Sequence, residues 1–234
     1  MYVRDTFYFK DSIEVEEKHT GRYGAPGEKR AKRTKPSPEQ IEKQNQWRRE
    51  RDLRRLIKEN FEENDLWVTL TYRKDARPPT LQDAKEDIGK CLRKLRGQYK
   101  RRGTALKYIV AVEIGSRGGV HHHLIINRID ESDKLLAKLW EKGRVHITLM
   151  YKQGGFRDLA EYIAKRPPDK ADKWYSRSRN LSVPQPKRKI MLGATFKREP
   201  QPPKDYYLEK ETYYQGINPV TGHRYRHYIF VRRC

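Results

Sequence analysis

The alternation of apolar and polar residues predicts strands and helices in turn along most of the chain. Runs rich in branched and aromatic residues indicate strands at 2–9, 66–73, 106–115, 120–127, 144–150, 189–196 and 224–232. Apolar residues three and four positions apart indicate helices at 39–61, from Thr80 to Tyr99, from Ser132 to a stop at Gly143, and at 155–166. The order from 66 to 150 predicts an α+β fold, a ferredoxin-like (split βαβ) antiparallel sheet with helices on one face.

The predicted elements divide the chain into three parts. Residues 1–62 are expected to form a basic arm that contacts DNA, made of a strand, a linker and a helix. Glycine, proline and lysine dominate 19–40, which predicts a mobile connector. The helix 39–61 has few apolar residues among its arginines, so it is expected on the protein surface or on DNA. Residues 63–190 are the predicted core, and the strands within 191–234 are candidates to complete the same domain.

The charge narrows the class of partner. The chain has 234 residues and a formal net charge of +22, which at this size favours a polyanion such as nucleic acid over a small molecule. Lysine and arginine gather at 22–58, 91–107 and 165–189. Each cluster alone is typical of a solvated surface. Three clusters around one core favour a groove or clamp for a phosphate backbone.

Other features bear on the compartment. No stretch approaches the ~20 apolar residues that span a bilayer, and the first residues lack the pattern of a signal peptide. The two cysteines, Cys91 and Cys234, are too few for a disulfide framework or a cysteine-based zinc site. We therefore expect a soluble protein in the reducing cytoplasm, with no membrane partner.

The stretch "GGVHHHLIIN", 118–127, places three histidines in a predicted strand. Because side chains alternate along a strand, His121 and His123 should share one face and His122 the other. If the hairpin loop centres near Arg117, Glu113 pairs with His121 on the face of His123, within ~5 Å of His121 by Cβ. These three residues would form a metal site with open positions for substrate.

The expected ligands, two imidazoles and one carboxylate, suit Mn²⁺ or Mg²⁺, with zinc as an alternative. His122 is assigned to packing or hydrogen bonding. Structural roles are also expected for the remaining histidines, which are His19, His146, His223 and His227.

The phrase "VEIGSRGGVHHHLIIN" resembles the metal-site strand of the HUH endonucleases, in particular rolling-circle replication initiators (Rep proteins) of plasmids, phages and integrative elements. His122 departs from that pattern, in which the middle residue is usually apolar. "WVTLTY" and "KWYSRSRNLSVPQP" resemble the strand before the metal hairpin and the basic segment after the catalytic helix. The resemblance covers residues 66 to about 186, and it implies that 63–190 is a HUH nuclease core.

The resemblance also implies a tyrosine nucleophile in a Tyr-x-x-Lys pattern. "GFRDLAEYIAKRP" supplies Tyr162 with Lys165 three residues on, where Lys165 would lower the pKa of the phenol or hold the phosphate. Tyr151 and Tyr175 are the alternatives to Tyr162. Asp and Arg occupy positions 158 and 166, which indicates the single-tyrosine class.

The function implied is site-specific nicking and rejoining of single-stranded DNA through a 5′-phosphotyrosine. It would act at a replication origin, with or without an adjacent duplex or hairpin. A host helicase and polymerase would be needed, because the chain has no Walker-type loop. A transposase or a relaxase is the alternative within the class. A basic nucleic-acid-binding protein without catalysis is the alternative outside it.

Overall fold

The computed structural model describes residues 1–19, 35–115, 118–151, 153–165, 175–193, Phe196, 199–218 and 221–233. The chain forms two compact units: unit 1 is Met1–Asn45 with Val183–Cys234, and unit 2 is Gln46–Ser182. These boundaries differ from the expected ones near residues 62 and 190. Most of the predicted basic connector, at 20–34, lies outside the described residues.

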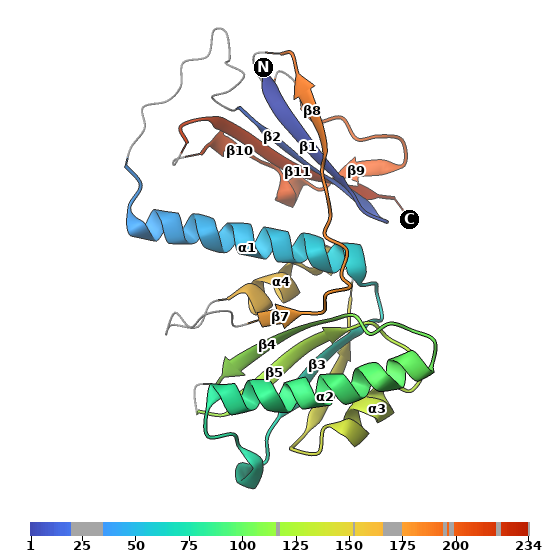
Figure 1. Cartoon of the computed structure of the whole chain (residues 1–234). Helices are drawn as coiled ribbons and strands as arrows, with labels where there is room; N and C mark the ends of the chain where they lie inside the picture. Colours follow the sequence, from blue (N-terminus) through green and yellow to red (C-terminus); the bar gives the residue numbers. More distant parts are fainter. Residues whose placement is uncertain are drawn as a thin grey trace. The chain divides into compact units, whose positions relative to one another are not determined.

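Unit 2 contains a five-stranded antiparallel sheet in the order β6-β3-β5-β4-β7 (Figure 1). Its strands are β3 (Leu66–Thr71), β4 (Tyr108–Ile114), β5 (Val120–Ile126), β6 (Val145–Leu149) and β7 (Tyr175–Arg177). With α2 between β3 and β4, and α3 between β5 and β6, the chain order is the predicted split βαβ arrangement. The predicted α+β fold class is confirmed.

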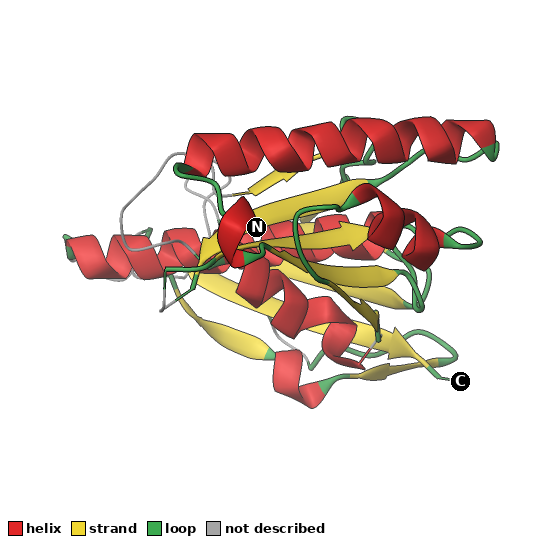
Figure 2. Ribbon diagram, turned by 90° about the horizontal axis from the view of Figure 1, so that it is seen from below, coloured by secondary structure: helices red, strands yellow, loops and turns green. Residues whose placement is uncertain are grey.

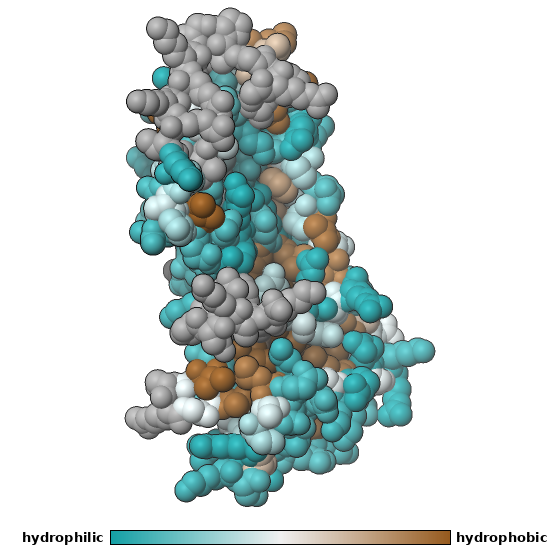
Figure 3. Space-filling model, turned by 60° about the vertical axis from the view of Figure 1, so that its left-hand side comes forward, coloured by the Kyte–Doolittle hydropathy of each residue, from teal (hydrophilic) through white to brown (hydrophobic). Residues whose placement is uncertain are grey.

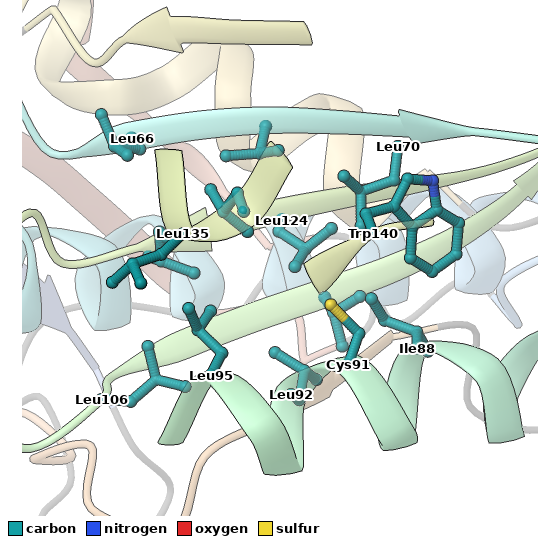
Figure 4. Close-up of a cluster of buried hydrophobic side chains, with 14 of the residues drawn as sticks. Leu66, Leu70, Ile88, Cys91, Leu92, Leu95, Leu106, Leu124, Leu135 and Trp140 are labelled. Carbon is teal, nitrogen blue, oxygen red and sulfur yellow. The ribbon is translucent and has the colours of Figure 1, made fainter. Parts of the chain in front are cut away.

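One face of this sheet packs against α2 (Leu81–Arg101) and α3 (Ser132–Leu139). Thr80 caps α2 through a reciprocal pair of bonds with Asp83, as its sequence position suggests. The apolar stripe of α2 meets alternate residues of the strands, and Figure 4 shows this core. The buried residues of α2 are Ala84, Ile88, Cys91, Leu92, Leu95 and Tyr99.

The other face of the sheet packs against α4 (Arg157–Ala164) and the second half of α1 (Pro38–Asn60). The expectation of helices on one face only was therefore wrong. Leu53, Leu56 and Ile57 of α1 are buried with apolar residues of α4, β4 and β5, so few apolar residues suffice when they share one short stripe. In Figure 2, helices run alongside the strands.

The turn before α4 uses two left-handed residues, Gly155 (φ 58°) and Phe156 (φ 62°). For the non-glycine residue this conformation costs ~1–2 kcal/mol, and burial of the Phe156 ring in the core beneath α4 offsets that cost. α4 ends at Ala164, two residues earlier than predicted, and the backbone of Lys165 is already extended. The following Arg166-Pro167 sequence disfavours further helix, since the residue before a proline avoids the α region.

α3 is also shorter than predicted, because it ends at Leu139 rather than at Gly143. Gly143 instead lies against the end of β3: a Cβ built on it would be 2.0 Å from the backbone oxygen of Thr71. The glycine is thus required by close packing of the α3–β6 turn on β3 and not by the helix end.

Unit 1 contains a six-stranded sheet in the order β10-β11-β2-β1-β8, with β9 also paired to β11. Its strands are β1 (Tyr2–Tyr8), β2 (Ser12–Lys18), β8 (Lys187–Met191), β9 (Tyr206–Leu208), β10 (Tyr214–Ile217) and β11 (Arg224–Arg232). Strands β2, β9 and β10 were not predicted. In β2, glutamates obscure the apolar alternation; two of them are buried against basic side chains, Glu17 with Arg226 and Glu14 with His227.

Three short 3₁₀ turns complete the described elements: η1 (Lys74–Ala76), η2 (Gln153–Phe156) and η3 (Lys210–Thr212). Hydrophilic residues cover much of the coloured surface in Figure 3. Within the described ranges, no helix has both the length and the apolar character needed to cross a bilayer.

Candidate active site

The hairpin of β4 and β5 has the predicted register. Glu113 pairs with His121, and Ala111 pairs with His123. Because side chains alternate, Glu113, His121 and His123 point to the face covered by α4, and His122 points to the face covered by α2. The short loop between the strands makes this register a local property of the sequence, which is why the pattern predicted it.

Tyr162 on α4 meets two of the three predicted ligands. Its phenol oxygen donates a short hydrogen bond to Oε2 of Glu113 and lies 3.0 Å from Nε2 of His123. The same Glu113 oxygen is 2.9 Å from Nε2 of His123. A carboxylate, an imidazole and a phenol from β4, β5 and α4 thus converge at one point.

The environment of this triad differs from one member to the next. His123 is 6% exposed, and burial lowers the pKa of its imidazole. Tyr162 is 44% exposed, so a large substrate has access to its hydroxyl. The pKa of Tyr162 is raised, first by desolvation and then by the hydrogen bond and negative charge of Glu113. In this arrangement the phenol is a neutral hydrogen-bond donor, and it needs a nearby positive charge to become a phenolate.

Two residues of β3 complete the surroundings of His123. Thr69 Oγ1 lies 3.2 Å from Nδ1 of His123, and the indole of Trp67 stacks on the imidazole with centroids 5.4 Å apart. Trp67 also touches the Tyr162 ring edge-on at 5.8 Å. Neither residue was given a role from the sequence. Their contacts depend on the pairing of β3 with β5, more than fifty residues apart, for which the sequence holds no local signal.

His121 shares the face but does not join the triad. Its ring centroid is 6.3 Å from that of His123, and its ring lies beside Gly115 and Gly119. Across the described ranges no three His, Cys, Asp or Glu side chains are grouped closely enough to hold a metal ion. The donor types on this face, one carboxylate and two imidazoles, are those of a divalent-cation site, and Thr69 at Nδ1 leaves Nε2 of His123 on the open side.

His122 lies in the opposite core, where it is fully buried. Its Nε2 is 2.8 Å from the hydroxyl of Tyr72, and its ring packs edge-on against Trp140. Burial lowers the pKa of His122 to about 4, so the ring is neutral at pH 7. It is a packed and hydrogen-bonded residue, as expected from the sequence.

The other predicted residues lie around this site in different ways. Lys165 is exposed and lies one residue beyond the last turn of α4, so it does not follow Tyr162 along a helical face. Tyr151 is 66% exposed just after β6, and Tyr175 lies in β7 opposite Ala111. Neither alternative tyrosine is part of the contact with Glu113 and His123, which Tyr162 makes.

The remaining histidines are placed as follows. His19 packs against the rings of Tyr2 and Phe196, and His227 bonds to Glu14. His146 is an exposed residue of β6, paired with Thr69. The backbone oxygen of His223 accepts a hydrogen bond from Asn218.

Residues 65–167 match a family model of replication-associated proteins, the one named for the replication-associated protein ORF2. The matched segment runs from β3 to just beyond α4 and contains Glu113, His121, His123, Tyr162 and Lys165. No curated protein and no solved structure matches the chain. The family match supports a replication-associated protein that acts with DNA.

Proposed function

We propose that the protein is a metal-dependent, single-tyrosine HUH endonuclease and ligase that nicks and rejoins one DNA strand to initiate rolling-circle replication. The observation that carries this proposal is the contact of the Tyr162 hydroxyl with Glu113 and His123 on an accessible surface. The match to a replication-associated family over the same segment supports it. The replicated element would be a plasmid, a phage or an integrative element in the cytoplasm.

The reaction follows from the groups present. The Tyr162 oxygen attacks the scissile phosphorus, a 5′-phosphotyrosine bond forms, and the bond to the 3′ oxygen breaks. Glu113 and His123 are within reach of the phenol proton, and the leaving 3′ oxygen becomes a hydroxyl by taking up a proton. Because one phosphodiester replaces another, the 3′ hydroxyl can later reverse the reaction without ATP.

Glu113, His121 and His123 are the residues that would hold the metal. Mn²⁺ or Mg²⁺ bound there would polarise the phosphate, neutralise its growing negative charge, and offset the carboxylate charge that raises the pKa of Tyr162. His121 would reach the ion by a change of rotamer, because its ring already lies on the correct face.

The partner in this proposal is single-stranded DNA at an origin, with a duplex or hairpin beside it. The net charge of +22 provides the attraction to the backbone, and exposed Lys165 at the end of α4 is placed to contact a phosphate. A helicase and a polymerase would be supplied by the host, the polymerase extending the released 3′ hydroxyl.

The test is incubation of a labelled origin strand with the full-length protein and Mn²⁺, followed by denaturing electrophoresis. We expect a covalent, SDS-resistant adduct that is lost with EDTA and lost in Tyr162→Phe, while Tyr162→Phe still binds the strand. A transposase or relaxase would form the same adduct, and origin-dependent replication in a host would separate these from an initiator. A non-catalytic binding protein would form none.

A further inference from the structure

Strand β3 contributes two side chains to the site without contributing a reacting group. Trp67 and Thr69 are two residues apart, so both point to the face that carries His123. Thr69 pairs directly with His123 across the sheet, and Trp67 pairs with Ile125, the next residue of β5 on that face. Both side chains are half-buried, and both touch His123.

Thr69 determines which imidazole nitrogen is free to act. Its hydroxyl is 3.2 Å from Nδ1, and the other nitrogen, Nε2, lies near Glu113 and Tyr162. A hydroxyl can accept the Nδ1 proton, and this leaves the lone pair of a neutral imidazole on Nε2. Thr69 thus favours the tautomer in which Nε2 accepts a proton or binds a cation.

Trp67 determines the plane of the imidazole. The two rings stack with an interplanar angle of 14°, which opposes rotation of His123 about its last side-chain bond. The Trp67 ring also meets the Tyr162 ring at 87°, and His123 meets Tyr162 at 78° with centroids 4.9 Å apart. One indole therefore contacts both the imidazole and the phenol ring.

We propose that Trp67 and Thr69 are positioning residues, which hold His123 and Tyr162 so that Nε2 and the phenol oxygen meet at Glu113. This inference rests on the proposed function for its effect on cleavage. The competing explanation is that Trp67 only fills the core beneath α1 and α4. In that case any apolar residue that preserves stability would serve equally well.

Thr69 is tested with an isosteric pair of variants. Thr69→Val removes the hydroxyl and keeps the shape, whereas Thr69→Ser keeps the hydroxyl. We expect Thr69→Val to slow single-turnover cleavage by roughly 10- to 100-fold, the usual effect of losing such an orienting partner, and Thr69→Ser to restore most of the rate. Affinity for the strand, measured in EDTA, should change less than about twofold in both, because neither variant alters the charge that binds the backbone.

Trp67 is tested with Trp67→Leu and Trp67→Phe, and Ile109→Val is the control. Ile109 is buried in the same core on β4, so Ile109→Val lowers stability without removing a ring from the site. We expect Trp67→Leu to lower the cleavage rate by about 100-fold, the size of a small misplacement of reacting groups, with unchanged strand affinity. Trp67→Phe should recover part of the rate, and Ile109→Val should cleave normally.

A measurement without DNA or metal tests the geometry itself. The ring current of a stacked indole shifts the Hε1 proton of His123 upfield in the NMR spectrum. This shift should be lost in Trp67→Leu and largely kept in Trp67→Phe. Thermal melting identifies any variant that fails to fold, and if Trp67→Leu does so, the Thr69 pair and Trp67→Phe decide the question.

The outcomes separate the two proposals. Normal cleavage in Thr69→Val and Trp67→Leu would overturn the positioning role while leaving the nuclease intact. An unshifted Hε1 proton in the wild-type protein would overturn it as well. If the wild-type protein forms no adduct with DNA, the proposed function fails, and the NMR shift still reports whether β3 holds the imidazole.

Discussion

At the residue scale, three consecutive histidines have three different surroundings. His123 joins Glu113 and Tyr162, His121 lies on the same face apart from them, and His122 is buried on the opposite face against Tyr72. The difference follows from the period of two along a strand combined with helices on both faces of the sheet. Identical side chains that are adjacent in sequence therefore have opposite expected roles.

Substitution of each histidine tests this division. His121→Ala and His123→Ala are expected to abolish metal-supported cleavage, by at least about 100-fold, because each removes a proposed ligand. His122→Ala should retain appreciable activity in the folded fraction, since His122 points away from the site. Single-turnover rates measure the effect, and circular dichroism monitors folding. Equal losses at all three positions would contradict the alternating-face account.

His122 also makes a prediction about stability and pH. Its folded-state pKa is about 4 against an ordinary value of 6.5, so between these values the unfolded chain binds the proton and the folded protein does not. Stability is therefore lost as the pH falls from 6.5 to 4, by about 3 kcal/mol from this residue. Urea unfolding should show that His122→Gln gains about this much relative to wild type between pH 7.5 and pH 4. Parallel curves for the two proteins would contradict the burial of a neutral imidazole.

The sequence predicted the site residues that depend on local geometry. Glu113, His121 and His123 followed from alternation and one short hairpin, and Tyr162 followed from a resemblance rather than from spacing. Trp67 and Thr69 could not be predicted, because they reach His123 through pairing of distant strands. The position of Lys165 was predicted from a helix that ends one residue too soon.

At the scale of elements, α2 was predicted well because its cap, its apolar stripe and its length agree. α1 was predicted in extent but not in placement, since a pattern that marks a buried stripe does not name the sheet face that receives it. β2 was missed because buried glutamates break the expected alternation, and the basic side chains that balance them lie on β1 and β11.

Gly143 provides a test of packing between elements. A Cβ there would overlap the backbone oxygen of Thr71, so Gly143→Ala must shift the α3–β6 turn away from β3. We expect a loss of about 1–3 kcal/mol in the free energy of unfolding. Gly97 in α2 is the matched control, because nothing lies within 4 Å of its added Cβ. Gly97→Ala should be neutral or gain up to ~1 kcal/mol, and a similar result at both positions would contradict the close approach.

At the scale of the whole molecule, unit 1 joins the two ends of the sequence in one sheet, as β1 pairs with β8 and β2 with β11. Such pairings join segments far apart in the sequence and leave no periodic signal, which is why the amino-terminal segment was expected to be an arm. The matched family segment lies almost entirely within unit 2, so the role of unit 1 does not follow from that match.

The net charge of +22 predicts a steep salt dependence of DNA binding. For a single strand, the logarithm of the binding constant should fall with the logarithm of salt concentration by about 0.7 per phosphate neutralised. Fluorescence anisotropy of a labelled strand in EDTA, from low to high salt, measures this slope. A flat response would mean that the basic clusters do not contact the backbone.

The most direct test of the central claim is to locate the covalent bond. The wild-type protein is incubated with an origin strand and Mn²⁺, the DNA is trimmed with nuclease, and tryptic peptides are analysed by mass spectrometry. Cleavage after Arg157 and Lys165 yields the peptide 158–165, whose sequence contains Tyr162 as its one tyrosine. We predict the nucleotide on that peptide and its loss in Tyr162→Phe; a nucleotide on a peptide containing Tyr151 or Tyr175, or on none, would contradict the assignment.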